Sequence, residues 1–379
     1  MQRYLLSITF LLAASALARA QTLQPATGTA APPRIAVENA PAPLFDDPVW
    51  HGASDPAVVW MPGKGEKGEY WMYYTQRRAT LPNPNGVDWV HGSAIGIATS
   101  PDGLHWKYNG VIQGSLKDGD AEKSLSDPVK DNVTWWAPTI FWEKGNGITV
   151  GGPAGQPGDK LHMLVTYVHG IFPRWTGDRT IEHLTSDDGV HWTYVSSLPL
   201  ASRRVIDPTV YKIDGTWYVW YKNEAAGSRT FWAKSSDLNT WQDLGDAKIG
   251  QGHEAPFVWH WKGAFWDLQD NGRALDAWRS DNGLDNWVTN TLLLTPTPNG
   301  QRPLDRGTGH HPWIVLQDPA SGPVPADDKQ LVLVYFAHEG NKTCMQMGEI
   351  TLGEDGKLVC DRNKYLATTP APPATQPAK

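Results

Sequence analysis

Short apolar segments recur along this chain in five units that share one pattern. Each unit opens with a proline followed two residues later by Val or Ile, at residues 55–58, 137–140, 207–210, 255–258 and 311–314. A second apolar segment follows in every unit, at residues 70–76, 161–168, 216–222, 264–270 and 331–337. Runs of this length, rich in aromatic and β-branched residues, predict β-strands.

The later part of each unit predicts two further strands. In four units a third segment runs through a turn into a strand that bears Trp106, Trp192, Trp241 or Trp287, and the fifth unit keeps the turn at residues 353–356 without the Trp. Four short strands repeated radially make a propeller blade. We therefore predict an all-β fold, a single five-bladed β-propeller over residues 46–367, with the Trp residues in its core. A β-sandwich also has many short strands, but it does not explain five repeats in one order.

The two ends of the chain differ from this repeat. Residues 1–20 combine Arg3, an apolar run and the ending Ala18-Arg19-Ala20, which predicts a secretory signal peptide and a periplasmic or secreted protein. Residues 21–45 are rich in Ala and Pro and predict a flexible leader, and residues 368–379 predict a disordered tail. Because the fifth unit contains four strand segments of its own, we expect that the leader does not add a strand to it.

Composition narrows the function. A net charge of −7 without any basic run argues against a nucleic-acid partner, and no segment after the signal approaches the length of a membrane span. The 20 Trp, 37 Gly and 30 Pro are typical of short strands, tight turns and aromatic surfaces that stack on sugars. A disulfide between Cys344 and Cys360 is allowed in an exported protein, although a regular hairpin would place Cys360 opposite Glu349. Oligomeric state stays open.

The residues before the five prolines are the candidate functional residues. Proline is tolerated at the start of a strand and favours an extended conformation in the residue before it. The innermost strands of a propeller begin around one axis, so we expect these positions to face one central funnel. They are Asp55, Trp136-Ala137, Asp207, Glu254-Ala255 and His310-His311.

Three carboxyl groups in one aromatic funnel suggest acid–base chemistry. Mutual repulsion and burial raise some of their pKa values, so that one group stays protonated while another is ionised. Glycoside hydrolysis needs this combination, and residues on different blades suit the wider carboxyl spacing of inverting enzymes. Asp55, Asp207 and Glu254 are thus the predicted catalytic residues.

These motifs resemble the five-bladed propeller enzymes of glycoside hydrolase family 43, over roughly residues 46–366. The resemblance implies that Asp55 in Ser-Asp-Pro is the general base and that Asp207 in Ile-Asp-Pro positions and tunes the acid. It implies that Glu254, two residues before Pro256, is the general acid. It also implies a central His, His311 or His310, beside a water or a calcium ion, so that His311 is the candidate metal ligand; no cofactor is otherwise required.

Further residues are predicted to bind substrate. Trp135 and Trp136 lie where an indole face can stack on a sugar, and the loops after the second strands carry Arg77 and Arg273, with Trp175, Arg179 and Arg229 as weaker candidates. His253, which lies beside Glu254, and the central His310 and His311 are also predicted to contact the substrate. Family members often have Gly where this chain has Ala255, and a related propeller family acting on anhydro-sugars uses a His as acid, so His253 and His311 are alternatives to Glu254.

The sequence therefore predicts an O-glycosyl hydrolase that releases terminal or side-chain sugars, of arabinofuranoside, xyloside or galactose type, from an oligo- or polysaccharide. Two other classes remain open. A non-catalytic carbohydrate-binding propeller would lack one of the three acids, and a glycoside phosphorylase would need a cluster of Arg, Lys and His facing the anomeric carbon.

Overall fold

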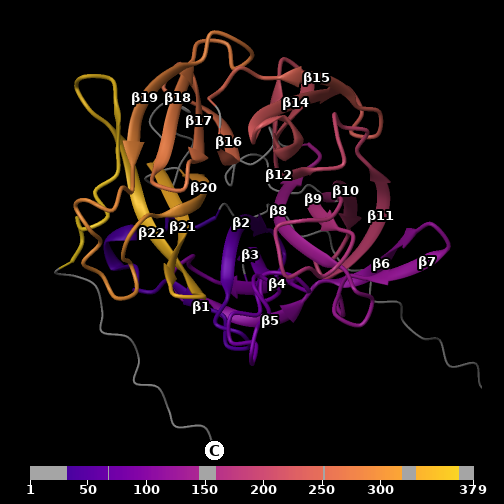
Figure 1. The fold of residues 1–379 in the computed structure, drawn as a ribbon. Coiled ribbons are helices and arrows are strands. Elements are labelled where there is room, and N and C mark those ends of the chain that lie inside the picture. Colours follow the sequence, from indigo (N-terminus) through magenta and orange to yellow (C-terminus); the bar gives the residue numbers. More distant parts are fainter. Residues whose placement is uncertain (1–31, 67, 145–158, 251, 318–329, 367–379) are drawn as a thin grey trace, which may run out of the picture.

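Five antiparallel sheets are arranged radially around one axis, which confirms the predicted all-β, five-bladed propeller (Figure 1). A computed structural model describes residues 32–66, 68–144, 159–250, 252–317 and 330–366. The predicted signal peptide and C-terminal tail lie outside the described residues. None of the described helices is long and apolar enough to cross a membrane.

The blades follow one another along the chain, and within each blade the strands are given in order from the axis outward. The first contains β2 (Ala53–Met61), β3 (Glu69–Gln76), β4 (Ala94–Ser100) and β5 (Lys107–Val111). The second contains β8 (Thr134–Trp142), β9 (Leu161–Val168), β10 (Arg179–Ser186) and β11 (His191–Ser197). The third contains β12 (Val205–Ile213), β13 (Thr216–Asn223), β14 (Arg229–Ser235) and β15 (Gln242–Asp246), with the 3-10 turn η2 (Glu224–Ala226) after β13.

The fourth and fifth blades complete the circle. The fourth contains β16 (Glu254–Trp261), β17 (Ala264–Asp270), β18 (Leu275–Ser280) and β19 (Val288–Leu293). The fifth contains β20 (His310–Gln317), β21 (Gln330–Glu339) and β22 (Lys342–Leu352), whose outer edge pairs with both β1 (Phe45–Asp46) and β23 (Leu358–Val359). The innermost strands β2, β8, β12, β16 and β20 contact one another in that order, and β20 returns to β2.

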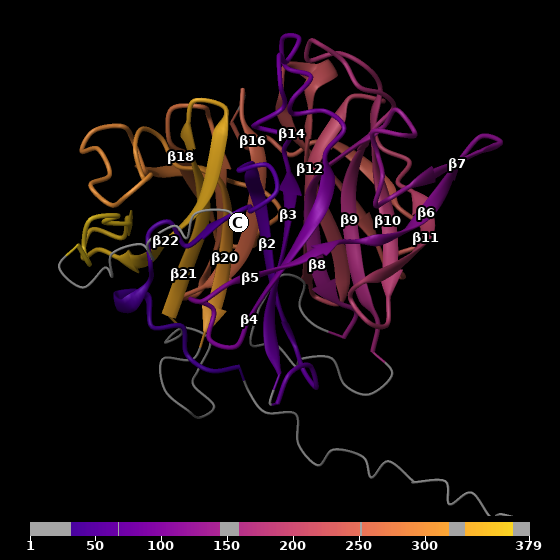
Figure 2. The same cartoon turned by 90° about the horizontal axis from the view of Figure 1, so that it is seen from below.

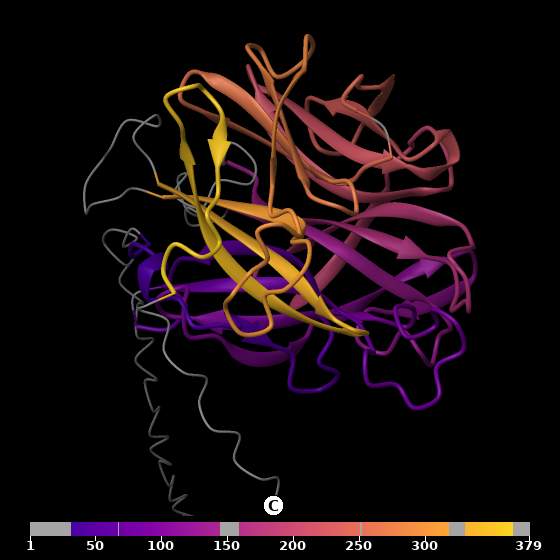
Figure 3. The same cartoon turned by 60° about the vertical axis from the view of Figure 1, so that its left-hand side comes forward.

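The leader is partly structured, so the prediction that it adds no strand is wrong. Phe45 and Asp46 pair with Met345 and Cys344 of β22, which joins the start of the propeller to its last blade. Ile35, the short helix η1 (Val37–Asn39) and the following residues to Leu44 pack into the core. The buried residues of this segment are Ile35, Val37, Ala40, Ala42 and Leu44, which alternate with prolines and polar residues. Figure 3 brings this blade forward.

Two peripheral features extend the blades. The hairpin of β6 (Gln113–Asp118) and β7 (Ala121–Ser124) pairs in parallel with β11, so that it covers the outer edge of the second blade (Figure 2). In the fifth blade Thr351 lies opposite Val359, one residue away from the regular hairpin register that we expected. Cys344 and Cys360 both carry free thiols.

The Trp-bearing turns tie the outer strands together, which explains their repetition. In the first blade Ser100 Oγ accepts a hydrogen bond from the Gly103 amide, and the Trp106 indole donates to the Gly103 carbonyl. The same two bonds recur around Ser186 and Trp192 and around Ser235 and Trp241. Trp192, Trp241 and Trp287 are buried and Trp106 packs against the core, as predicted.

Every innermost strand contains a β-bulge at its X-Pro step, where the register shifts by one residue. The residue before each proline has a left-handed backbone, with φ between +46° and +56° at Asp55, Ala137, Asp207, Ala255 and His311. The expectation that proline holds these residues extended is therefore wrong. In these bulges the residue before proline is the left-handed one, and in the second and third blades its amide is bonded by the preceding blade. Ala137 donates to Thr75 and Asp207 donates to Thr166.

The left-handed backbone predicts an unusual response to glycine at Ala137. Glycine there removes left-handed strain of roughly 1–2 kcal/mol, which exceeds the loss of a buried methyl group, about 0.8 kcal/mol. Ala337 on β21 is also fully buried but lacks a positive φ, so the same change gains no relief. We expect A137G to be less destabilising than A337G by roughly 1–2 kcal/mol in urea unfolding. Equal losses in the two variants would show that the bulge carries no strain.

Candidate active site

A cavity of about 340 Å³ opens on the axis where the innermost strands begin. Residues from all five blades line it: Asp55, Arg77, Val90, Trp136, Trp175, Arg179, Ile206, Asp207, Lys222, Glu224, Glu254, Asp270, His311 and Phe336. The three predicted catalytic carboxyls are among them. Trp136, His311 and Arg77, which were predicted to bind substrate, line the cavity as well, together with the weaker candidates Trp175 and Arg179.

Asp55 lies in a cationic environment. Its carboxylate is 3.1 Å from Arg77 Nη2 and 3.3 Å from His311 Nδ1, and Ser54 Oγ donates to it. Burial by itself would raise the pKa of Asp55, but the charge of Arg77, together with the contact to His311 and hydrogen bonds from Thr75 and Ser54, outweighs burial and holds the pKa below its ordinary value. Asp55 is thus ionised at neutral pH and can accept a proton.

Asp207 and Glu254 form a second acidic pair on the adjacent third and fourth blades. Asp207 is buried, and its Oδ2 accepts a hydrogen bond of 3.1 Å from the Ala255 amide. Burial and then the neighbouring charge of Glu254 raise the pKa of Asp207 well above its ordinary value. The Glu254 side chain is 45% exposed and is therefore the member of the pair that a substrate can reach. The raised pKa of Asp207 favours retention of a proton at this pair.

Lys222, at the end of β13, contacts Glu254. Its Nζ donates to Glu254 Oε2 at 2.8 Å and lies 3.9 Å from Glu224. Burial disfavours the ammonium, but the carboxyl groups of Glu254 and Asp207 outweigh this and raise the pKa of Lys222. Lys222 is therefore a cation beside the candidate proton donor.

Another part of the cavity wall combines aromatic rings with a buried cation. The Arg179 guanidinium lies 5.5 Å from the centre of the Trp136 ring and forms an ion pair with Glu224. Trp136 is fixed by a hydrogen bond of 2.7 Å from its indole nitrogen to the Val90 carbonyl. The ring centres of Trp175 and Trp136 lie 5.9 Å apart. Trp175 is 55% exposed, so its indole remains open to a ligand.

Asp270 supports the histidines of the fifth blade. Its Oδ2 binds His310 Nδ1 at 2.8 Å and accepts a longer hydrogen bond, 3.4 Å, from the His311 amide. His310 stacks on Phe336 and is held behind the cavity wall, so it is a supporting residue, not a lining one. Burial lowers the pKa of His311 despite its acidic neighbours, which favours the neutral imidazole.

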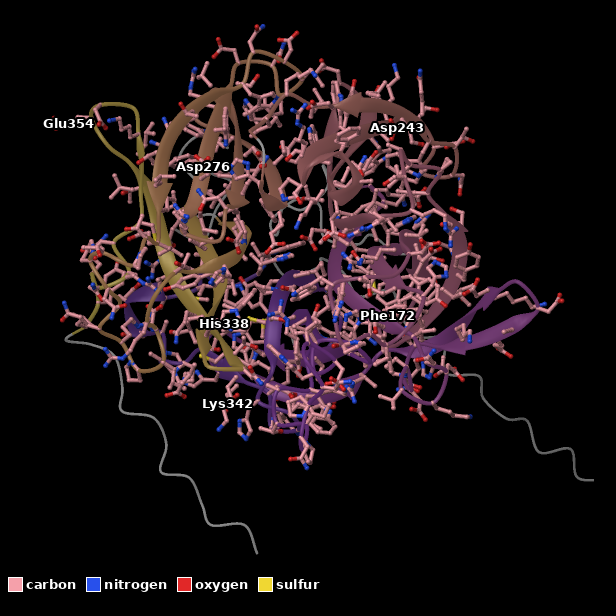
Figure 4. The ribbon with its side chains drawn as sticks, in the orientation of Figure 1. Phe172, Asp243, Asp276, His338, Lys342 and Glu354 are labelled. Carbon is pink, nitrogen blue, oxygen red and sulfur yellow. The ribbon has the colours of Figure 1, made fainter. Side chains whose placement is uncertain are left out.

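Of the residues predicted to bind substrate, His253, Trp135, Arg273 and the weaker candidate Arg229 lie outside the cavity, in addition to His310. His253 points to the other face of its strand, where its Nε2 binds Asp276 at 2.9 Å; Figure 4 labels Asp276 on the fourth blade. Trp135 is completely buried against Tyr167, because it faces away from its neighbour Trp136. Arg273 lies in the exposed turn between β17 and β18, so its side chain is directed to solvent.

Six cavity residues were not predicted from the sequence: the apolar Val90 and Ile206, and Lys222, Glu224, Asp270 and Phe336. Lys222, Asp270 and Phe336 occupy the last part of a second strand and pair directly with the residue before a bulge, which is Ile206, Glu254 and His310 respectively. Pairing each predicted second strand with its first strand would have located these three residues. Glu224 follows β13 in a turn that has no counterpart in the repeat.

The predicted calcium site has no ligand set among the described residues. No group of three or more His, Cys, Asp and Glu side chains in that part of the chain is arranged to hold a metal ion. The His311 ring lies against Asp55, and Asp270 is engaged by His310.

Comparison with known proteins gives structural matches only. No family model matches the sequence, and no curated protein matches it. The fold is similar to that of a thermostable family-43 glycoside hydrolase, with 17% identity, a TM-score of 0.52, and coverage of 84% of this chain and 96% of the other. It is also similar to a xylan β-1,4-xylosidase from Bacillus halodurans C-125, with 15% identity, a TM-score of 0.53, and coverage of 83% and 56%. The fold is similar as well to that of an α-L-arabinofuranosidase from Lactobacillus brevis, with 15% identity, a TM-score of 0.50, and coverage of 84% of this chain and 97% of the other. At these identities the chain is shown to share the fold of these structures.

Proposed function

We propose that this protein is a glycoside hydrolase that acts with inversion of configuration. One observation carries the proposal: two carboxyl groups in the same cavity have pKa values shifted in opposite directions. The pKa of Asp55 is lowered and that of Asp207 is raised. An ionised carboxylate and a retained proton are the two components that hydrolysis of a glycosidic bond needs. The similarity of fold to solved glycoside hydrolases supports the same reaction class.

In the proposed reaction Asp55 takes a proton from a water molecule as the water oxygen bonds to the anomeric carbon. The bond from that carbon to the leaving oxygen breaks, and Glu254 donates its proton to the leaving oxygen. Asp207 and Glu254 share one proton, which lies on Glu254 when it is donated. Asp207 also accepts a hydrogen bond from the Ala255 amide, which fixes the strand next to Glu254. Glu254 is the donor because its side chain is exposed to the cavity whereas Asp207 is buried.

The histidine alternatives are less consistent with the geometry. His253 is bound to Asp276 outside the cavity, and His311 has a lowered pKa beside the candidate base. A phosphorylase would need cations free to bind phosphate, but Arg77, Arg179 and Lys222 are each paired with a carboxylate. All three acids are present, which argues against a purely binding role.

We further propose that the substrate is a terminal or side-chain sugar of an oligo- or polysaccharide. A volume of about 340 Å³ is at the lower end for small-molecule sites, which favours one sugar unit over an extended chain. The similar structures include a xylosidase and an arabinofuranosidase, so pentosides are the first candidates, with galactose-type sugars after them. The N-terminal apolar segment supports action in the periplasm or outside the cell.

Substitution of the two principal carboxyls separates their roles. D55N should lower kcat by about 10²–10⁴-fold on every substrate, because no base activates the water. E254Q should cause a loss of that size on natural oligosaccharides and a much smaller one on aryl glycosides whose leaving group needs no proton. E122Q, on the exposed β6–β7 hairpin, is the matched control.

The released sugar should carry the inverted anomeric configuration in NMR spectra of the first product. Near-normal turnover by D55N on both kinds of substrate would contradict the assignment of the base, and a retained anomer would contradict inversion.

Arg77 should determine the acid limb of the pH profile. Asp55 must be ionised to act, and its lowered pKa keeps it ionised to below the ordinary titration range of Asp. Removing the cation in R77M raises that pKa, so the acid limb of kcat/KM should move to higher pH while the alkaline limb stays. R229M, at a surface ion pair with Asp246, should leave both limbs unchanged. An unshifted acid limb in R77M would show that Asp55 is not the titrating base.

A further inference from the structure

Glu224 brings a carboxylate to the cavity wall from a turn that the other blades lack. It is the first residue of η2, directly after β13, and its amide donates to the Arg204 carbonyl at 2.9 Å. The preceding Asn223 caps the turn, because its Oδ1 accepts a hydrogen bond of 3.1 Å from the Ala225 amide. Backbone contacts therefore fix the point from which the Glu224 side chain reaches the cavity.

The two oxygens of this carboxylate have different surroundings. Oε2 accepts a hydrogen bond from the completely buried Arg179, and Arg204 Nη2 lies 3.7 Å from it. Oε1 lies 3.9 Å from Lys222 Nζ, which is beyond hydrogen-bond distance. No group within the described ranges of the chain donates a hydrogen bond to Oε1. Arg179 thus holds the carboxylate in place and leaves one of its oxygens available to a ligand.

The charges around the cavity favour a neutral ligand that donates hydrogen bonds. The lining includes five carboxyl groups and three basic side chains, which are Asp55, Asp207, Glu224, Glu254 and Asp270 against Arg77, Arg179 and Lys222. Each of the three basic side chains already contacts a carboxylate. An anionic ligand would meet more acidic groups than basic ones, whereas a hydroxyl group can donate to a carboxylate oxygen without bringing a charge.

Lys222 connects the available oxygen to the candidate proton donor. Its Nζ lies 2.8 Å from Glu254 Oε2 and 3.9 Å from Glu224 Oε1. One sugar ring with its hydroxyl groups can therefore bridge the two carboxyl groups. Arg179, which holds Glu224, also lies 5.5 Å from the centre of the Trp136 ring, so the carboxylate and the aromatic face belong to one wall.

We propose that Glu224 Oε1 accepts a hydrogen bond from a hydroxyl group of the terminal sugar, and that this contact selects a neutral sugar with that hydroxyl unsubstituted. This inference rests on the proposed function, because it places the glycosidic oxygen of the same sugar at Glu254. A sugar without the hydroxyl displaces water from Oε1 and returns no donor, which costs binding energy. Glu224 thus determines specificity and takes no part in proton transfer.

The test begins with analogues of the substrate on the full-length protein. The aryl arabinofuranoside, xyloside or galactoside that is hydrolysed best is compared with its monodeoxy and mono-O-methyl analogues. We expect one monodeoxy analogue to lose about 10–100-fold in kcat/KM through Glu224, the size of a hydrogen bond to a charged group. The O-methyl analogue at that position should lose at least as much, because an ether oxygen cannot donate.

Variants of Glu224 show whether the missing hydroxyl contacts this side chain. E224Q should lower kcat/KM on the parent glycoside and narrow the parent-to-deoxy ratio at that one position by at least about fivefold, because an amide oxygen is a weaker acceptor than a carboxylate. E224D keeps a charge beside Arg179 but withdraws the carboxylate by one methylene group, so it should narrow the same ratio. It serves as the second variant if circular dichroism shows that E224Q does not fold.

A purely structural role gives a different pattern. If Glu224 only holds Arg179, each variant lowers kcat/KM by one common factor on the parent and on every analogue, and this result would overturn the inference. E122Q, on the exposed β6–β7 hairpin, is the matched control and should keep all the wild-type ratios.

The outcomes distinguish this inference from the function on which it rests. If glycosides are hydrolysed but neither variant changes any parent-to-deoxy ratio, the inference fails and the proposed function stands. If the wild-type protein hydrolyses no glycoside in the panel, the proposed function fails. Calorimetric binding of free arabinose, xylose, galactose and their deoxy counterparts to wild type and the variants then replaces kcat/KM. Absence of binding, or variant effects that are equal for a sugar and all its deoxy counterparts, would overturn the inference in that case also.

Discussion

The left-handed bulge at the start of each innermost strand is the constraint on which the site depends. A bulge places two residues of one strand opposite a single partner residue. Two consecutive side chains can then face the same cavity, whereas a regular strand would send them to opposite faces. Ile206 and Asp207 both line the cavity for this reason.

The same bulges link the blades around the axis. The amides of Ala137 and Asp207 donate to threonines of the preceding blade, and the amide of Ala255 donates to Asp207 itself. The candidate catalytic carboxyl of the third blade thus also holds the strand that carries Glu254. Structure and chemistry share one side chain there, so the relative positions of the acidic pair are set by the backbone of two adjacent blades.

Much of the fold could be predicted from the sequence because each blade repeats the same local rules. Proline, apolar segments and Trp-bearing turns recur in one order, and a periodic pattern survives errors in any single unit. The leader was misjudged because its few apolar residues, such as Ile35 and Leu44, are dispersed among prolines and gain their burial from distant parts of the chain, the first blade near Gly103 and the strand β22. That pairing spans almost the whole chain and leaves no local signal.

The candidate site could be predicted only in part, for a related reason. The position before a proline identified Asp55 and Asp207, but it did not show which of two neighbours faces the cavity. Trp136 and Glu254 face it, and Trp135 and His253 do not.

The five blades share one backbone arrangement around the cavity but differ in the residue that each places at the bulge. Asp55, Asp207 and His311 occupy the left-handed position in three blades, and alanine occupies it in the other two. In those two blades the residue before the alanine, Trp136 or Glu254, supplies the side chain that reaches the cavity. A methyl group at the left-handed position leaves room for this. The rotational symmetry of the propeller therefore positions five equivalent sites, and the choice between two adjacent positions in each blade decides which of them bears a base, an acid or an aromatic wall.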